Sequence, residues 1–296
     1  MKLVYSPKYD IDIGSHIFPT AKYASVQKQL LETGGSKADI VEPQPASWED
    51  LALVHAEDYL EKIQNESLSY AEIVQMEIPW SEAMVEGFRL MCGGTCLAAR
   101  LAVEHGMAAH IGGGFHHAFA DHGEGFCIFN DVAVAARVLL RDKVVRMVAI
   151  VDLDVHHGNG TAAIFSDDEG VFTFSMHQQN NYPAVKPRSD LDIGLPDETD
   201  DDMYMAELER GLPEVLAYTP DLIIYLAGAD PYRLDQLGGL NLTIDGLRQR
   251  DRLVLETARS ANIPVAITLA GGYAERFEDT VAIHLGTIEE AMKISV

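Results

Sequence analysis

Short apolar segments alternate with longer amphipathic segments along most of this chain, and this alternation constrains the fold more than any other feature. Each apolar segment is dense in β-branched residues and is bounded by glycine or polar residues, which is typical of a buried strand. Because strands that alternate with helices form parallel sheets, we expect an α/β fold with a mostly parallel central sheet and helices on both faces. The predicted strands span 2–5, 107–111, 147–152, 171–176, 222–227 and 263–269, and the predicted helices span 81–106, 130–141, 200–218, 244–261 and 276–292.

The length and composition are those of a globular protein. The 296 residues contain no linker-like or repetitive segment, so we expect a single domain over residues 1–296. No apolar run approaches the roughly 20 residues of a membrane span, and the N-terminus does not resemble a signal peptide. We therefore expect a cytoplasmic protein without a membrane span. Three scattered cysteines predict no disulfide framework, and nothing indicates the oligomeric state.

The charge balance is strongly acidic. Asp and Glu number 46 against 22 Lys and Arg, which gives a net charge of −24. Direct binding to nucleic acid is disfavoured, because neutralising phosphates requires a basic surface. The same field would attract cationic substrates such as lysine-rich tails or polyamines. An acidic surface that serves only solubility is an equally good interpretation.

One polar segment, residues 152–161, follows the apolar run at 147–151. In an extended backbone, side chains at alternate positions point the same way, so Asp152, Asp154 and His156 should share one face. Carboxylates and an imidazole on one face form a plausible half of a divalent metal site. Taken alone, the segment is better explained as a solvated acidic turn with a stray histidine, because motifs of this length often match by chance.

Polar residues also follow the other predicted strands. His116 and His117 come after the strand at 107–111, Asp230 after that at 222–227, and Tyr273 after that at 263–269. Ligands of α/β sheets bind at the carboxyl ends of the strands, so these residues should meet Asp154 and His156 there. Asp154, His156 and Asp230 would supply three ligands to zinc, ferrous iron or manganese. A histidine of the pair could transfer protons and Tyr273 could stabilise an oxyanion, which together describes amide hydrolysis.

Several motifs then resemble the histone deacetylase family. They are Gly-Gly-Phe-His-His at 113–117, Gly-Phe-Cys at 125–127, Asp-Leu-Asp-Val-His-His-Gly-Asn-Gly-Thr at 152–161, Ser-Met-His at 175–177, Ala-Gly-Ala-Asp at 227–230 and Gly-Gly-Tyr at 271–273. The resemblance runs in order from about residue 4 to residue 290 and implies the arginase-deacetylase fold. The compact length and the segments 180–183 and 237–240 look most like the class IV branch and its bacterial relatives.

The resemblance implies a role for each matching residue. Zinc, with ferrous iron as an alternative, would be the catalytic cofactor, and an acylated lysine in a protein or peptide, or a small acylated amine, would be the substrate. Zinc would be bound by Asp154, His156 and Asp230. His117 would act as general base and acid with electrostatic help from His116, while Asp152 would orient His116, Asn159 would orient His117, and Tyr273 would stabilise the oxyanion.

The resemblance also implies a substrate tunnel and a second ion. The acyl-lysine tunnel would be lined by Gly125, Phe126, Tyr182 and Leu237. A structural potassium ion would be held by Asp152, Asp154, His156, Ser175 and Met176.

Three departures from the family pattern affect what can be expected of the protein. Residues 16–22 lack the usual Pro-x-Arg pattern, so the resemblance does not predict the form of the substrate entrance or of any exit channel. Asn159 replaces the aspartate of some branches, so His117 should lack a charged partner and have a lower pKa. No extended regulatory tail is present, so we expect no stable corepressor partner.

Three alternatives to a lysine deacylase remain at this point. An acetylpolyamine hydrolase is favoured by the acidic charge but disfavoured by the absence of a long insertion at the entrance. An arginase-like ureohydrolase shares the fold class but needs ligands for two manganese ions. An inactive acyl-lysine reader is the non-enzymatic alternative, and the full ligand set with Tyr273 argues against it.

Overall fold

The computed structural model describes residues 1–34 and 39–295. Within these residues, eight strands form one sheet in the order β2-β1-β3-β8-β7-β4-β5-β6, and every paired ladder is parallel. The strands are β1 (Lys2–Val4), β2 (Ile40–Val41), β3 (Met107–His110), β4 (Val148–Asp152), β5 (Val171–Gln178), β6 (Leu191–Leu195), β7 (Leu222–Leu226) and β8 (Val265–Thr268). The predicted α/β fold with a central parallel sheet is therefore confirmed.

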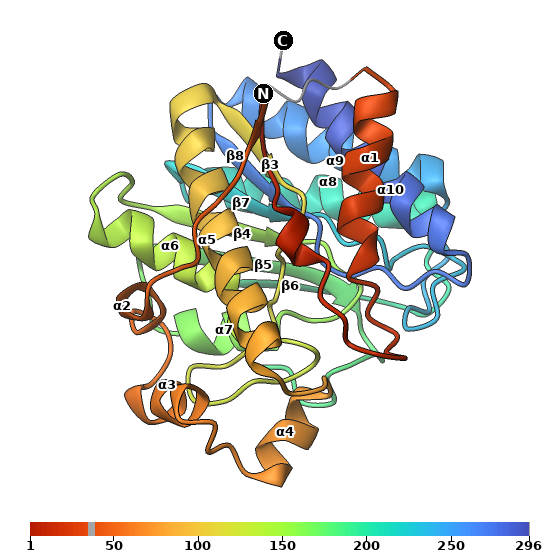
Figure 1. The fold of residues 1–296 in the computed structure, drawn as a ribbon. Coiled ribbons are helices and arrows are strands. Elements are labelled where there is room, and N and C mark those ends of the chain that lie inside the picture. The colour runs from red at the N-terminus through yellow and green to blue at the C-terminus, as the bar shows by residue number, and fades with distance from the viewer. Residues whose placement is uncertain (35–38, 296) are drawn as a thin grey trace.

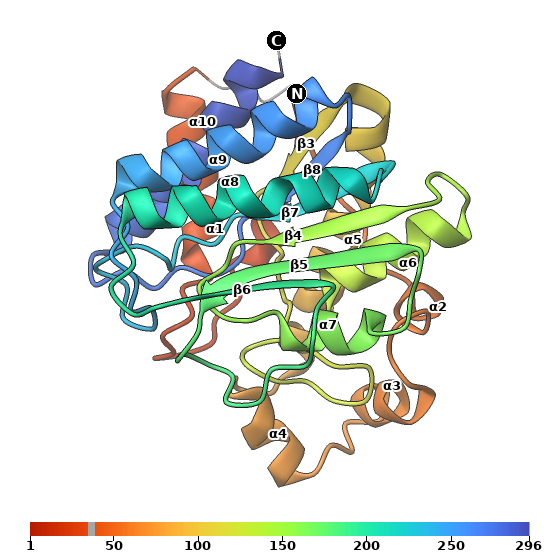
Figure 2. The ribbon, with the colours of Figure 1, turned by 180° about the vertical axis from the view of Figure 1, so that it is seen from behind.

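Helices cover both faces of this sheet, as Figures 1 and 2 show from opposite sides. The long α5 and its neighbour α6 lie on one face, and α8, α9 and α10 lie on the other. The helices are α1 (Ala21–Glu32), α2 (Trp48–Leu51), α3 (Glu57–Gln64), α4 (Tyr70–Met76), α5 (Glu82–His105), α6 (Asp131–Arg141), α7 (Asn159–Phe165), α8 (Asp201–Ala217), α9 (Ile244–Ser260) and α10 (Phe277–Ile294), with a 3₁₀ turn at Pro7–Tyr9. None of the helices in these described ranges is both long and apolar enough to cross a membrane.

The central strands are buried along their whole length. Every residue of β4 and of β7 is buried, as expected for strands covered by helices on both faces. The edge strand β6 differs, because buried and exposed residues alternate along it. No strand was predicted at β6, because this short segment carries an aspartate and a glycine among only three apolar residues.

The strand order brings the important loops together. β3, β8, β7 and β4 are neighbours in the sheet although they lie far apart in the sequence. The segments 111–117, 269–273, 227–230 and 153–157 follow these four strands. Because the four strands are parallel, all four segments leave the sheet at the same edge, where crevices form in sheets of this kind.

Candidate active site

Three of these segments, those that follow β3, β4 and β8, line a cavity of about 450 Å³ at the carboxyl edge of the sheet. Its lining includes the predicted ligands Asp154 and His156, and Asp230 packs directly behind them. His116, His117 and Tyr273 line it as well, together with the four predicted tunnel residues Gly125, Phe126, Tyr182 and Leu237.

Asp154, His156 and Asp230 form a compact buried cluster. Nδ1 of His156 lies 3.0 Å from Oδ1 of Asp154 and 3.5 Å from Oδ2 of Asp230. One ligand atom from each of the three residues lies within 4.8 Å of the others. Oδ2 of Asp230 is buried and has no hydrogen-bond partner among residues 1–34 and 39–295. An orphaned carboxylate oxygen that faces an imidazole nitrogen and a second carboxylate fits a divalent cation, so these residues suit the expected metal.

The ionisation of the cluster supports the same interpretation. Burial raises the pKa of Asp230 to about 7, and the nearby charge of Asp154 contributes to this increase. Burial lowers the pKa of His156, but its hydrogen bond to Asp154 and the charges of Asp154 and Asp230 outweigh that effect and raise it to about 10. Without a cation, His156 and Asp230 therefore bind protons. A bound cation would replace these protons and balance the negative charges of Asp154 and Asp230.

Backbone amides and a glycine fix the two carboxylates. Gly271 donates its N–H to Oδ2 of Asp154 at 2.8 Å, and Val155 donates to Oδ1 of Asp230 at 2.9 Å. A Cβ atom at position 271 would lie 1.9 Å from Oδ2 of Asp230. Only glycine therefore allows the loop after β8 to approach the ligands this closely.

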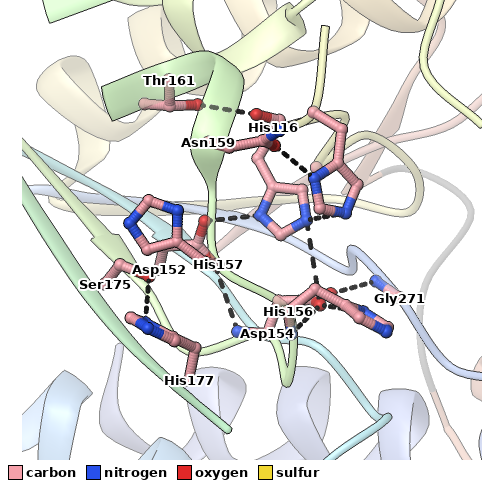
Figure 3. Close-up of polar contacts among 12 residues, drawn as sticks. His116, Asp152, Asp154, His156, His157, Asn159, Thr161, Ser175, His177 and Gly271 are labelled. Carbon is pink, nitrogen blue, oxygen red and sulfur yellow. Dashed lines mark hydrogen bonds and ion pairs between the residues drawn. The ribbon is translucent and has the colours of Figure 1, made fainter. Parts of the chain in front are cut away.

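The histidine pair lies beside this cluster, and Figure 3 shows His116 next to Asp154. Nε2 of His116 is 3.1 Å from Nε2 of His117 and 3.8 Å from Oδ1 of Asp154. Nδ1 of His116 contacts Oδ2 of Asp152 at 2.6 Å, and Nδ1 of His117 contacts Oδ1 of Asn159 at 2.6 Å. The structure thus brings together both predicted histidine–partner pairs, which would orient the two rings.

The two histidines have opposite ionisation properties. Burial disfavours the charged form of His116, but Asp152 and Asp154 outweigh burial and raise its pKa to about 9. Burial lowers the pKa of His117 well below its usual value, and the neighbouring His116 and His156 lower it further. A neutral imidazole beside a cationic one divides proton acceptance and charge stabilisation between two residues.

Aromatic rings form the rest of the cavity wall. The Phe126 ring meets the Tyr273 ring edge to face with centroids 5.9 Å apart, and Tyr182 meets His117 edge to face at 5.0 Å. Burial raises the pKa of Tyr273 well above its usual value, as do the charges of Asp230 and Asp154. Its hydroxyl therefore keeps its proton and can donate it in a hydrogen bond.

The segment after β4 is less extended than the sequence predicted. β4 ends at Asp152, and the chain bends through residues 154–156. Asp152 consequently contacts His116, while Asp154 and His156 face Asp230. Ser175 pairs with Asp152 across the β4–β5 ladder. Ser175 and Met176 thus lie next to the segment that is expected to hold potassium, and that ion stays a prediction.

A second cluster lies behind this segment, formed by His157, His177 and Asp192. Nε2 of His157 is 3.1 Å from Oδ1 of Asp192. Nδ1 of His177 is 3.0 Å from the Ser175 hydroxyl (Figure 3). The first contact joins the loop after β4 to β6, and the His157 ring meets the His177 ring of β5 edge to face at 4.6 Å. We therefore assign the cluster to support of that loop.

Two residues of the site were not anticipated. Lys22 is fully buried, donates from Nζ to the Ala270 carbonyl at 2.7 Å, and lies 5.7 Å from the centroid of the Tyr273 ring. Burial lowers its pKa to about 8, partly opposed by nearby carboxylates that include Asp230. Glu124 accepts hydrogen bonds from two predicted site residues. One sign in the sequence indicated that Lys22 is buried near the site, namely its position on the otherwise apolar face of a helix. The sequence contained no such sign for Glu124.

Comparisons with known proteins agree with this geometry. A model of the histone deacetylase domain matches residues 16–287. An uncharacterized protein of Picosynechococcus sp. is 44% identical over 285 residues, covering 95% of each chain. Histone deacetylase 2 of Arabidopsis thaliana is 34% identical, covering 95% of this chain and 77% of its own, and the acetoin utilization protein AcuC of Bacillus subtilis is 32% identical, covering 84% and 71%. The crystal structure of an HDA15 HD domain superposes with a TM-score of 0.80 at 21% identity, covering 99% of this chain and 91% of that one, which supports the fold.

Proposed function

The chain belongs to the histone deacetylase family, a family of deacetylase-type hydrolases, and we propose that it is a zinc-dependent deacylase of acyl-lysine side chains. One observation carries the proposal. Oδ2 of Asp230, which has no hydrogen-bond partner among the described residues, lies 3.5 Å from Nδ1 of His156, and His156 lines the same cavity as His116, His117 and Tyr273. A metal-assisted amide hydrolysis needs these groups together.

The residues of the cavity divide the work of the reaction. Asp154, His156 and Asp230 would hold the zinc, which when bound supplies Lewis-acid activation of a water molecule and of the substrate carbonyl. Nε2 of His117 would take the proton of the attacking water and later give it to the leaving lysine amine. Asn159 would keep the Nδ1 proton of His117 in place through its 2.6 Å contact.

Two further residues would stabilise the negative charge of the transition state. His116, held by Asp152, would contribute its positive charge beside His117. The Tyr273 hydroxyl would donate a hydrogen bond to the oxyanion that develops on the substrate. Both groups are buried, so their electrostatic effect would be stronger than in water.

The walls of the cavity support a lysine substrate. Phe126 and Tyr182 present aromatic rings, and Gly125 approaches His117 so closely that an added Cβ would lie 2.7 Å from the histidine ring. We propose that the aliphatic stem of acyl-lysine passes between Phe126 and Tyr182, with Leu237 beside it. An apolar stem would replace water there and bring the amide to the histidines.

A small acylated polyamine is a second candidate substrate. Glu77 lines the cavity, and the net charge of −24 would attract a cationic molecule. A polyamine could place a free ammonium group near Glu77 while its acylated end reaches the histidines.

Turnover of a defined substrate panel tests the proposal. The protein would be loaded with zinc or with ferrous iron and assayed on acetyl-, butyryl-, octanoyl- and myristoyl-lysine peptides, N-acetylputrescine and N-acetylspermidine. We expect hydrolysis of at least one lysine peptide, and loss of that activity in His117→Ala. Faster turnover of the acetylpolyamines would favour the second candidate. Stoichiometric metal with no hydrolysis of any substrate would overturn the proposal in favour of an acyl-lysine reader.

We also propose a structural potassium ion beside the zinc, held by Asp152, Asp154, His156, Ser175 and Met176, partly through backbone carbonyls. The pairing of Asp152 with Ser175 across neighbouring strands supports it. Replacing potassium with tetramethylammonium in the buffer should lower thermal stability, and an unchanged melting temperature would contradict this site.

A further inference from the structure

Glu124 lies in the loop between β3 and α6, immediately before the cavity residues Gly125 and Phe126. Its side chain is 18% exposed. One carboxylate oxygen, Oε1, receives two hydrogen bonds, from Nδ2 of Asn159 at 2.7 Å and from the Tyr182 hydroxyl at 3.0 Å. Both donors belong to residues that contact His117. Glu124 therefore lies directly behind the partners of the proposed base.

The chemistry of an amide gives this contact a direction. An ionised carboxylate only accepts hydrogen bonds, whereas an asparagine side chain has one accepting oxygen and one donating nitrogen. Glu124 therefore requires the nitrogen of Asn159 on its own side, so the oxygen of Asn159 must face His117. That oxygen can only accept, which requires the hydrogen on Nδ1 of His117.

The other nitrogen of His117 is then free to accept a proton. With the hydrogen on Nδ1, the Nε2 atom has a lone pair and lies toward Nε2 of His116, 3.1 Å away. If the Asn159 amide were reversed, its N–H would face Nδ1 of His117 and favour the tautomer with the hydrogen on Nε2. That tautomer could not take a proton from water.

We propose that Glu124 is a positioning residue that sets the orientation of the Asn159 amide and, through it, the tautomer of His117. The inference rests on the proposed function, in which Nε2 of His117 is the base. Glu124 also holds the Tyr182 hydroxyl, so the same carboxylate joins the base to one wall of the substrate cavity. Within the part of the chain that the structure describes, its second oxygen makes only longer contacts, to Gln75 at 3.5 Å and to His122 at 3.5 Å.

A set of four variants tests this role. A glutamine can either accept or donate, so in Glu124→Gln the Asn159 nitrogen no longer has to face position 124. We expect turnover to fall about 10- to 100-fold, the usual effect of losing a partner behind a ligand or base. Asn159→Asp alone places two carboxylates in contact and should also lower turnover. The double variant Glu124→Gln/Asn159→Asp should recover activity, because the introduced glutamine can donate to the introduced aspartate, which still accepts from His117. Gln75→Ala, which loses only a long contact to the second oxygen, should match the parent.

The tautomer of His117 provides a second measurement that does not depend on turnover. Imidazole ¹⁵N chemical shifts should show the hydrogen on Nδ1 in the parent and in Gln75→Ala, and a mixture of tautomers in Glu124→Gln. Melting temperatures identify any variant that fails to fold. A parent that hydrolyses nothing would contradict the proposed function, whereas the chemical shifts would still test Glu124.

Two results would overturn the inference. One is a His117 tautomer that is unchanged in a folded Glu124→Gln variant. The other is a double variant that is no more active than Glu124→Gln, since a purely structural role for Glu124 predicts no rescue by Asn159→Asp.

Discussion

Zinc binding to the cluster of Asp154, His156 and Asp230 should release protons, because the metal-free cluster holds protons where the cation would bind. The pKa of His156 is raised to about 10, so at pH 7 its ring is an imidazolium with one proton more than the neutral form that binds a metal. The pKa of Asp230 is raised to about 7, so this carboxyl is about half protonated at the same pH. Metal ligands must lose their protons, so zinc should displace about 1.5 protons at pH 7.

The affinity for zinc should follow from this proton release. With about 1.5 to 2 protons displaced, lowering the pH from 7 to 6 should weaken zinc binding about 30- to 100-fold. In Asp230→Asn the partly protonated carboxyl is gone, and the release at pH 7 should fall to about one proton. The affinity should fall by about 100-fold or more, because even partners behind a ligand contribute 10- to 100-fold.

Isothermal titration calorimetry measures both quantities. Titrations at one pH in two buffers with different heats of ionisation report the number of protons released, and a competing chelator brings the affinity into range. Asp200→Asn is a matched control, since it removes one negative charge from the cap of α8 and leaves a side chain that can still cap the helix. The reasoning would be refuted if the parent released no protons between pH 6 and 8, or if Asp230→Asn bound zinc like the parent.

Three further predictions concern individual residues. Tyr273→Phe should keep its zinc and lose about 10²- to 10³-fold in kcat, as for loss of one oxyanion donor, and an unchanged kcat would exclude that role. Gly271→Ala should weaken zinc binding at least tenfold by chelator competition, because the new Cβ would lie 1.9 Å from Oδ2 of Asp230, whereas parent-like affinity would show that the loop can move aside. His55 has its pKa lowered to about 4 by burial, and its Nε2 accepts a hydrogen bond from the Asn130 N–H at 3.1 Å. As the pH falls from about 6.5 to 4, His55 binds a proton in the unfolded chain but stays neutral in the folded protein. The free energy of unfolding of the parent should therefore fall by about 3 kcal/mol more than that of His55→Gln. Urea unfolding at pH 7 and pH 4 measures this difference, and equal acid losses in the two proteins would contradict it.

The local pattern predicted most of the sheet and most of the candidate site. The strands β4, β7 and β8 were found because a buried parallel strand is a short apolar run, and such a run is a local property. The ligands were found because Asp154, His156 and Asp230 come just after these runs. Parallel strands place the residues after their carboxyl ends at one edge of the sheet. The type of each residue and its position after a strand were therefore enough to predict the three ligands.

Two contacts between distant segments were not predicted from the sequence. Glu124 contacts Asn159 across 35 residues, and Lys22 reaches the Ala270 carbonyl across 248 residues. Each contact depends on strand order and on the path of a loop, which no local pattern contains. The edge strand β6 was missed for a related reason, since its few apolar residues gain their burial only by pairing with β5.

The amino-acid sequence by itself determined which donor groups the protein has and that they follow parallel strands. The tertiary structure decided which groups meet. Because β4 ends at Asp152 and the chain then bends, Asp152 contacts His116, while Asp154 and His156 join Asp230. A side chain's chemistry is a property of its own atoms, but its partner is set by the packing of segments that are remote in sequence, and this packing also brings Glu124 behind Asn159.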